Sequence, residues 1–345
     1  MRRRRVLARL AIAFVSTLAF AQQEPVSTEA DWLLRDFIFH TGERLPELRL
    51  HYLTMGTPQR DESGRVRNAV LLLHGTASSS APFLTSGFLG ALFLPGQPLD
   101  AQKYFLILPD CIGHGDSSKP SNGLHAKFPA YDYADLVEAQ YRLVREHLRI
   151  DHLRLILGLE AGGMQAWLWG EQHPEFADAL MPIGASPAAI SGRQRVYRDM
   201  VIDAIESDPA WNGGEYTSPP RGLLTAQSVI YLMTQGAGYL QQLAPAPDIA
   251  DAMFQSWRRR ALRMADANDL LYQFHASKDY DPAPDVEKIR ARVLSVNFAD
   301  DELNPPETSV ARGRQVWIPA SKETRGSATA LRARVWRDHV AELIQ

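Results

Sequence analysis

The sequence has 345 residues, of which 45% are hydrophobic and 22% are charged, and it carries a formal net charge of −3 at pH 7. This composition is typical of a globular protein with one large domain or two smaller ones. A net acidic chain lacks the basic face that binds phosphates, so we expect no nucleic-acid partner. The single cysteine, Cys111, excludes a disulfide within the chain.

The first 21 residues have the features of a secretory signal peptide. Four arginines follow the initial methionine, an apolar segment runs from Val6 to Ala21, and it ends in the small-x-small triplet Ala19-Phe20-Ala21. This segment is shorter than the roughly 20 residues that a membrane-spanning helix needs, which favours cleavage over retention as an anchor. We therefore predict a periplasmic or secreted protein with no stable membrane span after cleavage. Removal of residues 1–21, which contain five arginines and no acidic residue, changes the net charge from −3 to −8.

After an N-terminal extension at residues 22–47, the chain alternates between short apolar runs and helical patterns. Uninterrupted apolar runs are typical of parallel strands that are buried on both faces. Residues 132–148, between two of these runs, place apolar side chains at helical spacing. Strands that alternate with helices predict an α/β fold. The predicted strands are residues 69–75, 104–110, 153–159, 179–185, 293–299 and 315–320.

The alternation stops between residues 187 and 285. This segment has a helical pattern, is rich in Trp, Tyr and Met, and is interrupted by prolines, among them Pro219, Pro220, Pro245 and Pro247. We interpret it as a helical cap inserted into the α/β domain, whose two parts are residues 48–186 and 286–345. Its large side chains could cover a small apolar ligand, although such side chains more often belong to a core. They are Trp211, Tyr216, Tyr231, Met233, Tyr239, Trp257 and Tyr272.

The stretch Gly158-Leu159-Glu160-Ala161-Gly162 lies between a predicted strand and a predicted helix. Glycines two residues before and two residues after a central position suit the tight, strained turn of a G-x-S-x-G nucleophile elbow. Glu160 occupies the central position, where a serine would be the nucleophile. Two loops that follow other predicted strands, His74-Gly75-Thr76 and residues 110–117, are also typical of α/β-hydrolases.

From about residue 48 to its C-terminus, the chain resembles the homoserine O-acetyltransferase-like branch of the α/β-hydrolase superfamily. The resemblance implies a mostly parallel sheet flanked by helices, with an inserted helical cap. It also implies a Ser-Asp-His triad that transfers an acyl group or hydrolyses an ester. The motifs that carry it are EAGGMQAWLWG with the following HPEFADALMPIGASP, then ADDELNPPE, and finally IPASKETRG.

The resemblance assigns a position in this chain to each part of the site. The nucleophile position falls on Glu160, and the histidine position falls on Ser327. The acid position falls on Asp301, with the adjacent Asp300 as the alternative. The backbone amides of Thr76 and Ala161 would form the oxyanion hole.

Two of the three triad positions therefore lack the residue that acyl transfer needs. A serine hydroxyl becomes nucleophilic through an imidazole base, and neither group is present. His339 lies twelve residues beyond Ser327 in a helical pattern, so it is better explained as a packed or exposed helix residue than as the catalytic base. His74 and His114 are better explained as side chains that tie loops to nearby backbone. No histidines have metal-ligand spacing, so we expect neither a metal nor another cofactor.

Three functions stay open at this point, and whether the chain is an enzyme at all is undecided. We expect an exported homologue that is catalytically impaired or that binds a small apolar or acyl-type molecule. One alternative is a hydrolase or lyase in which Glu160 is a carboxylate nucleophile, or a general base whose pKa an apolar cap raises. A second alternative is an acyl-ester hydrolase or acyltransferase with an unrecognised nucleophile. The sequence indicates no oligomeric state.

Overall fold

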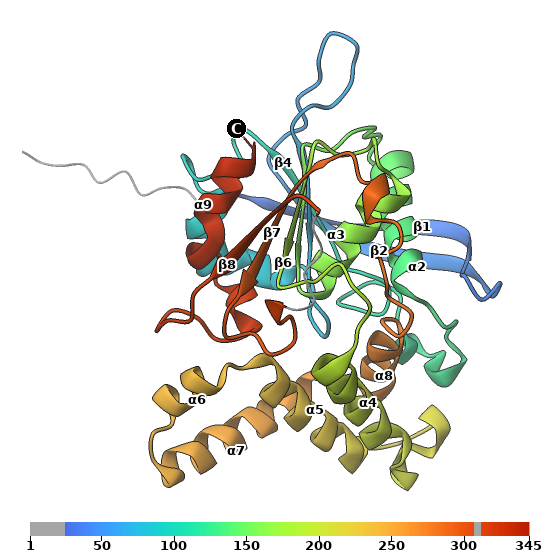
Figure 1. Cartoon of the computed structure of the whole chain (residues 1–345). Helices are drawn as coiled ribbons and strands as arrows, with labels where there is room; N and C mark the ends of the chain where they lie inside the picture. Colours follow the sequence, from blue (N-terminus) through green and yellow to red (C-terminus); the bar gives the residue numbers. More distant parts are fainter. Residues whose placement is uncertain (1–24, 307–311, 345) are drawn as a thin grey trace, which may run out of the picture.

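The computed structural model describes residues 25–306 and 312–344, and within them one eight-stranded sheet runs through the molecule (Figure 1). The strand order is β1-β2-β4-β3-β5-β6-β7-β8. β1 and β2 pair antiparallel, β2 is antiparallel to β4, and the remaining pairs are parallel. The predicted α/β fold with a mostly parallel sheet is confirmed. The predicted signal peptide, residues 1–21, lies outside the described residues.

The six strands from β3 to β8 coincide with the six predicted apolar runs. Every residue of β3, β4, β5 and β6 is buried, because helices cover both faces of this part of the sheet. The six strands are β3 (Ala69–Leu73), β4 (Phe105–Pro109), β5 (Leu155–Leu159), β6 (Ala179–Ile183), β7 (Arg292–Phe298) and β8 (Arg314–Ile318).

The segment interpreted as an N-terminal extension contributes to the sheet. β1 (Ser27–Ile38) and β2 (Arg44–Met55) form a long antiparallel hairpin at one edge, in which Ser27 pairs with Met55 and Ile38 with Arg44. Buried and exposed positions are mixed along β1 because much of this hairpin faces solvent. A search for uninterrupted apolar runs therefore misses both strands.

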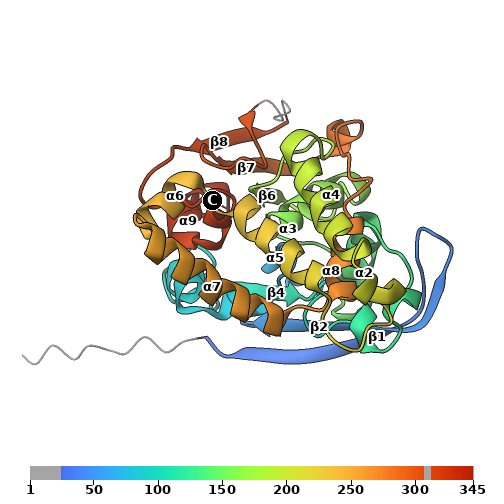
Figure 2. The ribbon, with the colours of Figure 1, turned by 90° about the horizontal axis from the view of Figure 1, so that it is seen from below.

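Helices pack on the two faces of the sheet (Figures 1 and 2). On one face, α2 (Tyr133–Arg142) and α3 (Ala161–Gln172) bury Val137, Trp167 and Trp169 against the strands. On the other face, α9 (Ala333–Ile344) buries Trp336 and Val340 together with the short α1 (Ser86–Phe88). The helix predicted at residues 132–148 is α2 followed by a π-helical turn at Leu143–His147.

Five helices between β6 and β7 form a separate layer, which lies below the sheet in Figure 1. They have a hydrophobic cluster of their own, with Val201, Leu223 and Phe274 among its members. Leu303, which follows β7, is part of the same cluster and so links this layer to the sheet. The helices are α4 (Gly192–Glu206), α5 (Arg221–Thr234), α6 (Ala237–Leu243), α7 (Pro247–Met264) and α8 (Ala267–His275).

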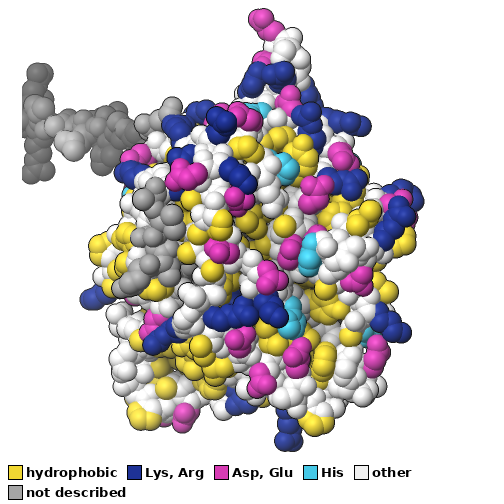
Figure 3. All heavy atoms as spheres, turned by 45° about the vertical axis from the view of Figure 1, so that its right-hand side comes forward, with side chains coloured by type: hydrophobic (Ala, Val, Ile, Leu, Met, Phe, Trp, Pro, Cys, Tyr) yellow, Lys and Arg dark blue, Asp and Glu magenta, His cyan; other side chains and the backbone are white. Residues whose placement is uncertain are grey.

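The surface of the protein carries acidic and basic side chains that intermingle over the face shown in Figure 3. Among the residues that the structure describes, none of the helices combines the length and the apolar composition that a bilayer crossing requires.

Candidate active site

Glu160 occupies a strained turn between β5 and α3. Its backbone has φ 51° and ψ −113°, a conformation that is costly for a residue with a side chain. A Cβ on Gly158 would lie 2.0 Å from the carbonyl oxygen of Gly162, and one on Gly162 would lie 2.3 Å from that of Leu73. Both glycines are therefore required by close backbone contacts, and the turn has the geometry of a nucleophile elbow.

The Glu160 side chain lies between two loops that are far apart in the sequence. A Cβ on Gly75 would be only 2.5 Å from Oε2 of Glu160, so the carboxylate packs directly against the His74-Gly75-Thr76 loop. On the other side, the Ser327 hydroxyl donates a long hydrogen bond of 3.3 Å to Oε1. The structure thus brings together the residues at the nucleophile and histidine positions.

The two neighbouring aspartates after β7 have different surroundings. Asp301 is 4% exposed, and its carboxylate accepts hydrogen bonds from the Leu303 amide and the Asn304 side chain, both at 2.9 Å. Asp300 instead accepts a hydrogen bond of 3.0 Å from the backbone amide of Gly326. Asp300 therefore holds the loop that carries Ser327, whereas Asp301 is close enough to Glu160 for its charge to affect the pKa of that residue.

Burial makes both carboxyl groups weak acids. Burial raises the pKa of Glu160 to about 7, the negative charge of Asp301 adds to the rise, and the Ser327 hydrogen bond and the Arg198 charge oppose it. Burial also raises the pKa of Asp301 to about 6, although its hydrogen bonds with Asn304 and Leu303 lower that pKa. Near neutral pH, the pair can therefore hold and release a proton.

A pocket of about 460 Å³, part of it open to solvent, lies between the strand ends and the helical layer. Thr76, Glu160, Ala161 and Ser327 all line it, whereas Asp301 is not one of its lining residues. The rest of the wall combines polar and apolar side chains, most of them from α4, α5 and α8 or from the loop after β7. These residues are Ala77, Met164, Gly184, Gln194, Arg198, Ile230, Met233, Thr234, Phe274, Leu303 and Asn304.

The two residues proposed to form the oxyanion hole, Thr76 and Ala161, both line this pocket. Ala161 is the first residue of α3, where the helix offers its amide no acceptor. The loop before Thr76 is fixed by His74, whose Nδ1 is 2.9 Å from the Gly75 oxygen and whose Nε2 accepts from the Cys111 amide at 3.0 Å. His74 thus has the loop-tying role that its position predicts.

The other two histidines that were considered also lie apart from Glu160. His114 Nδ1 is 2.9 Å from the backbone oxygen of Ile112. His339 belongs to α9, where it lies 3.5 Å from Glu342. Neither residue lines the pocket, so neither replaces the missing base.

The sequence did not single out Gln194 and Arg198, two polar residues of the pocket wall. Both are buried, and they lie one turn apart on the side of α4 that also carries the buried Val201 and Ile205. The sequence signal that could have found them is their helical spacing from the apolar residues Val201 and Ile205, which places two polar side chains on a buried face. Of the cap side chains named as possible pocket residues, only Met233 lines the pocket.

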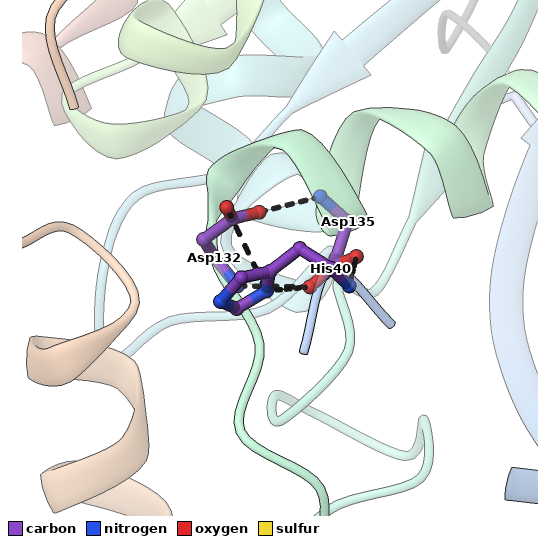
Figure 4. A group of neighbouring side chains, drawn as sticks. All are labelled: His40, Asp132 and Asp135. Atoms are coloured by element: carbon purple, nitrogen blue, oxygen red, sulfur yellow. Dashed lines mark hydrogen bonds and ion pairs between the residues drawn. The ribbon is translucent and has the colours of Figure 1, made fainter. Parts of the chain in front are cut away.

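Two clusters among the described residues bring carboxylates and a histidine close enough to share an ion, but both lie outside this pocket. One contains His51, Asp110 and Asp116. In the other, His40 Nδ1 is 2.7 Å from Asp135, and Asp132 and Asp135 cap the start of α2 through each other's backbone amides (Figure 4). These carboxylates are thus already engaged in holding the β1–β2 hairpin to α2.

Comparisons with known proteins agree with this architecture. Residues 68–325 match the family described as alpha/beta hydrolase fold. The chain is 30% identical over 275 residues to the "Probable acyltransferase" of Methanothermobacter thermautotrophicus, which covers 79% of this chain and 83% of the relative. It is 30% identical over 301 residues to a homoserine O-acetyltransferase of Haemophilus influenzae, covering 77% of this chain and 81% of the relative.

Solved structures show the same fold. The crystal structure of homoserine O-acetyltransferase from Bacillus anthracis superposes with a TM-score of 0.81 at 20% identity, covering 93% of this chain and 98% of that one. An acetylester hydrolase from Corynebacterium glutamicum superposes with a TM-score of 0.79 at 19% identity, covering 92% and 96%. The chain therefore belongs to the α/β-hydrolase fold family, in its homoserine O-acetyltransferase-like branch.

Proposed function

We propose that this chain is an exported member of the family that binds a small apolar or acyl-type molecule in the capped pocket and does not perform serine-dependent acyl transfer. One observation carries the proposal. At the elbow stands the Glu160 carboxylate, and its partner is the hydroxyl of Ser327, where a histidine base is expected. A hydroxyl cannot serve as the general base that imidazole provides. Export is supported by residues 1–21, whose arginines, apolar segment and final small-x-small triplet are typical of a secretory signal peptide.

The charge of Glu160 argues further against acyl transfer. A tetrahedral intermediate places a negative oxygen near the amides of Thr76 and Ala161. When ionised, Glu160 stands next to this position and would repel that oxygen. The pocket itself is retained, which favours binding as its use.

The test is turnover by the purified protein on short-chain esters, thioesters, lactones and haloalkanes, with Glu160→Gln in parallel. Glutamine keeps the shape of the side chain and removes its charge and basicity. We expect no turnover by either protein, together with saturable binding of one of the acyl compounds by both. Turnover that disappears in Glu160→Gln would overturn the proposal in favour of carboxylate chemistry.

A second candidate function uses Glu160 as a general base or nucleophile. Its pKa of about 7 suits proton abstraction at neutral pH. As a base, Glu160 could take a proton from the substrate or from Ser327, whose hydroxyl is the one that contacts it. Ser327 would then be the unrecognised nucleophile of an acyl-ester hydrolase. As a nucleophile, Glu160 would attack carbon, expel the leaving group and form an ester that a base-activated water must cleave.

Ser327→Ala separates these chemistries if turnover is found. Loss of activity in both Ser327→Ala and Glu160→Gln would assign the nucleophile to Ser327 and the base to Glu160. Loss in Glu160→Gln alone would assign direct carboxylate chemistry. Mass spectrometry of the intact protein would reveal a Glu160 ester as an added mass if the second half of a nucleophilic cycle stalls.

A further inference from the structure

Among the residues that the structure describes, Arg198 of α4 is a buried cation without an acidic partner. It is 6% exposed, and its Nη1 donates a hydrogen bond of 2.8 Å to the neutral hydroxyl of Ser277. Its guanidinium carbon lies 5.4 Å from the centre of the Phe274 ring. Its Nε has no hydrogen-bond partner within the described part of the chain. Among the described residues, no carboxylate forms an ion pair with it within 4.0 Å.

Burial of Arg198 is unfavourable unless its guanidinium meets an anion. A buried charge that lacks a counter-ion is strongly destabilising, and most buried charges are paired for that reason. A guanidinium also offers parallel donors that match the two oxygens of a carboxylate. An anionic ligand would therefore supply the negative counter-charge that Arg198 lacks among the described residues.

The position of Arg198 places this requirement at the candidate active site. Arg198 lines the pocket together with Glu160 and with Gln194, one turn earlier on α4. Its charge also opposes the rise in the pKa of Glu160, as a nearby cation does. Arg198 and Glu160 thus line the same cavity, and Arg198 also lines a neighbouring pocket that contains Ser277.

We propose that the ligand of this pocket is a short-chain monocarboxylate, whose carboxylate Arg198 binds and whose alkyl group lies against the apolar wall. The proposal rests on the ligand-binding function given above and names the ligand class. A single negative charge is favoured because Glu160 and Asp301 repel anions of higher charge. The apolar part of the wall is Met164, Ile230, Met233, Phe274 and Leu303.

The experiment is isothermal titration calorimetry of the full chain at pH 6 with sodium butyrate, with butyramide, which has a similar shape and no charge, and with inorganic phosphate. We expect butyrate to bind at least tenfold more tightly than either of the other two. Arg198→Gln should weaken butyrate at least tenfold. The control is Arg195→Gln, which removes a cation of the same helix that does not line this pocket and should change butyrate affinity less than twofold.

If Arg198→Gln proves unfolded by circular dichroism, Arg198→Lys keeps the charge without the paired donors. It should bind butyrate less tightly than the wild type while still preferring it over butyramide. Equal binding of butyrate and butyramide, insensitive to Arg198→Gln, would overturn this inference and leave the ligand-binding function standing. Tighter binding of phosphate would also overturn it. Absence of binding for all charged and neutral acyl probes would contradict the ligand-binding function as well.

Discussion

Glu160 fits its site because the residue opposite it has no side chain. A Cβ on Gly75 would approach Oε2 of Glu160 to 2.5 Å and its Cβ to 3.3 Å, while Ser327 contacts the carboxylate from the other side. The side chain therefore has little freedom to move away. Gly75 and Glu160 are predicted to be energetically coupled.

A double-mutant cycle tests this coupling. Gly75→Ala should destabilise the wild type by about 1–3 kcal/mol, the typical cost of overpacking, measured by urea unfolding. In a Glu160→Ser background the obstructing carboxylate is gone, so the same substitution should cost much less. Equal costs in the two backgrounds would contradict the described position of the Glu160 side chain.

The raised pKa of Glu160 also predicts how stability depends on pH. The folded chain binds this proton more tightly than the unfolded chain, so the contribution to stability is full below pH 4.5 and is lost as the pH rises through about 7. Glu160→Gln mimics the protonated form and should remove this loss. We expect the variant to exceed the wild type by on the order of 2–3 kcal/mol at pH 8.5 and to match it near pH 4.5.

Chemical unfolding at both pH values measures this difference. Glu287→Gln, a substitution at an exposed glutamate, provides the matched control and should leave the pH profile unchanged. A stability difference between wild type and Glu160→Gln that stays constant from pH 4.5 to 8.5 would contradict the raised pKa.

Individual site residues were predictable where a motif fixes the backbone. Gly158 and Gly162 located the elbow and therefore Glu160, because their backbone contacts leave no alternative residue. The choice between Asp300 and Asp301 depends on contacts with a loop some 26 positions away, such as the Gly326 amide. Sequence proximity carries no information about such contacts.

At the scale of elements, the β1–β2 hairpin is attached to the core through the start of α2. His40, just after β1, donates its backbone amide to Asp135 at 2.9 Å, and its ring lies 2.7 Å from the same carboxylate. Asp132 lies 3.6 Å from the ring. The hydrogen bond with Asp135 raises the pKa of His40 despite partial burial of the ring.

This attachment predicts a second pH dependence. Because the folded-state pKa of His40 is raised, its stabilising contribution is full below pH 6.5 and is lost as the pH rises through the raised value. His40→Gln should be less stable than the wild type at pH 6, by less than about 1 kcal/mol because the pair is partly exposed. The two proteins should converge at pH 9 in urea unfolding, and a difference that grows with pH would contradict the assignment. His125→Gln serves as the control histidine substitution.

The elements themselves were predictable in proportion to their burial. β3, β4, β5 and β6 are buried along their whole length and therefore appear as uninterrupted apolar runs. β1 was missed because only Leu34 and Phe37 are buried along its twelve residues. Arg198 was missed although it is in register with the buried Val201 and Ile205, because its burial depends on how α4 packs against α8.

At the scale of the whole molecule, the scaffold that α/β-hydrolases use is intact around a substituted triad. The elbow, the buried Asp301 and the loop before Thr76 come from β5, β7 and β3, and the helical layer closes a pocket over them. On the proposed function, we expect that only these two side chains prevent serine-dependent acyl transfer. Glu160→Ser combined with Ser327→His should restore a Ser-His-Asp arrangement without any change of fold.

The decisive measurement is the hydrolysis of p-nitrophenyl acetate and butyrate by the wild type and by the Glu160→Ser/Ser327→His variant, with the two single variants as controls. We expect rates at the buffer level for the wild type and both single variants. For the double variant we expect turnover at least tenfold above them. Wild-type turnover equal to that of the double variant would contradict the claim that Glu160 and Ser327 remove serine-dependent acyl transfer from this site.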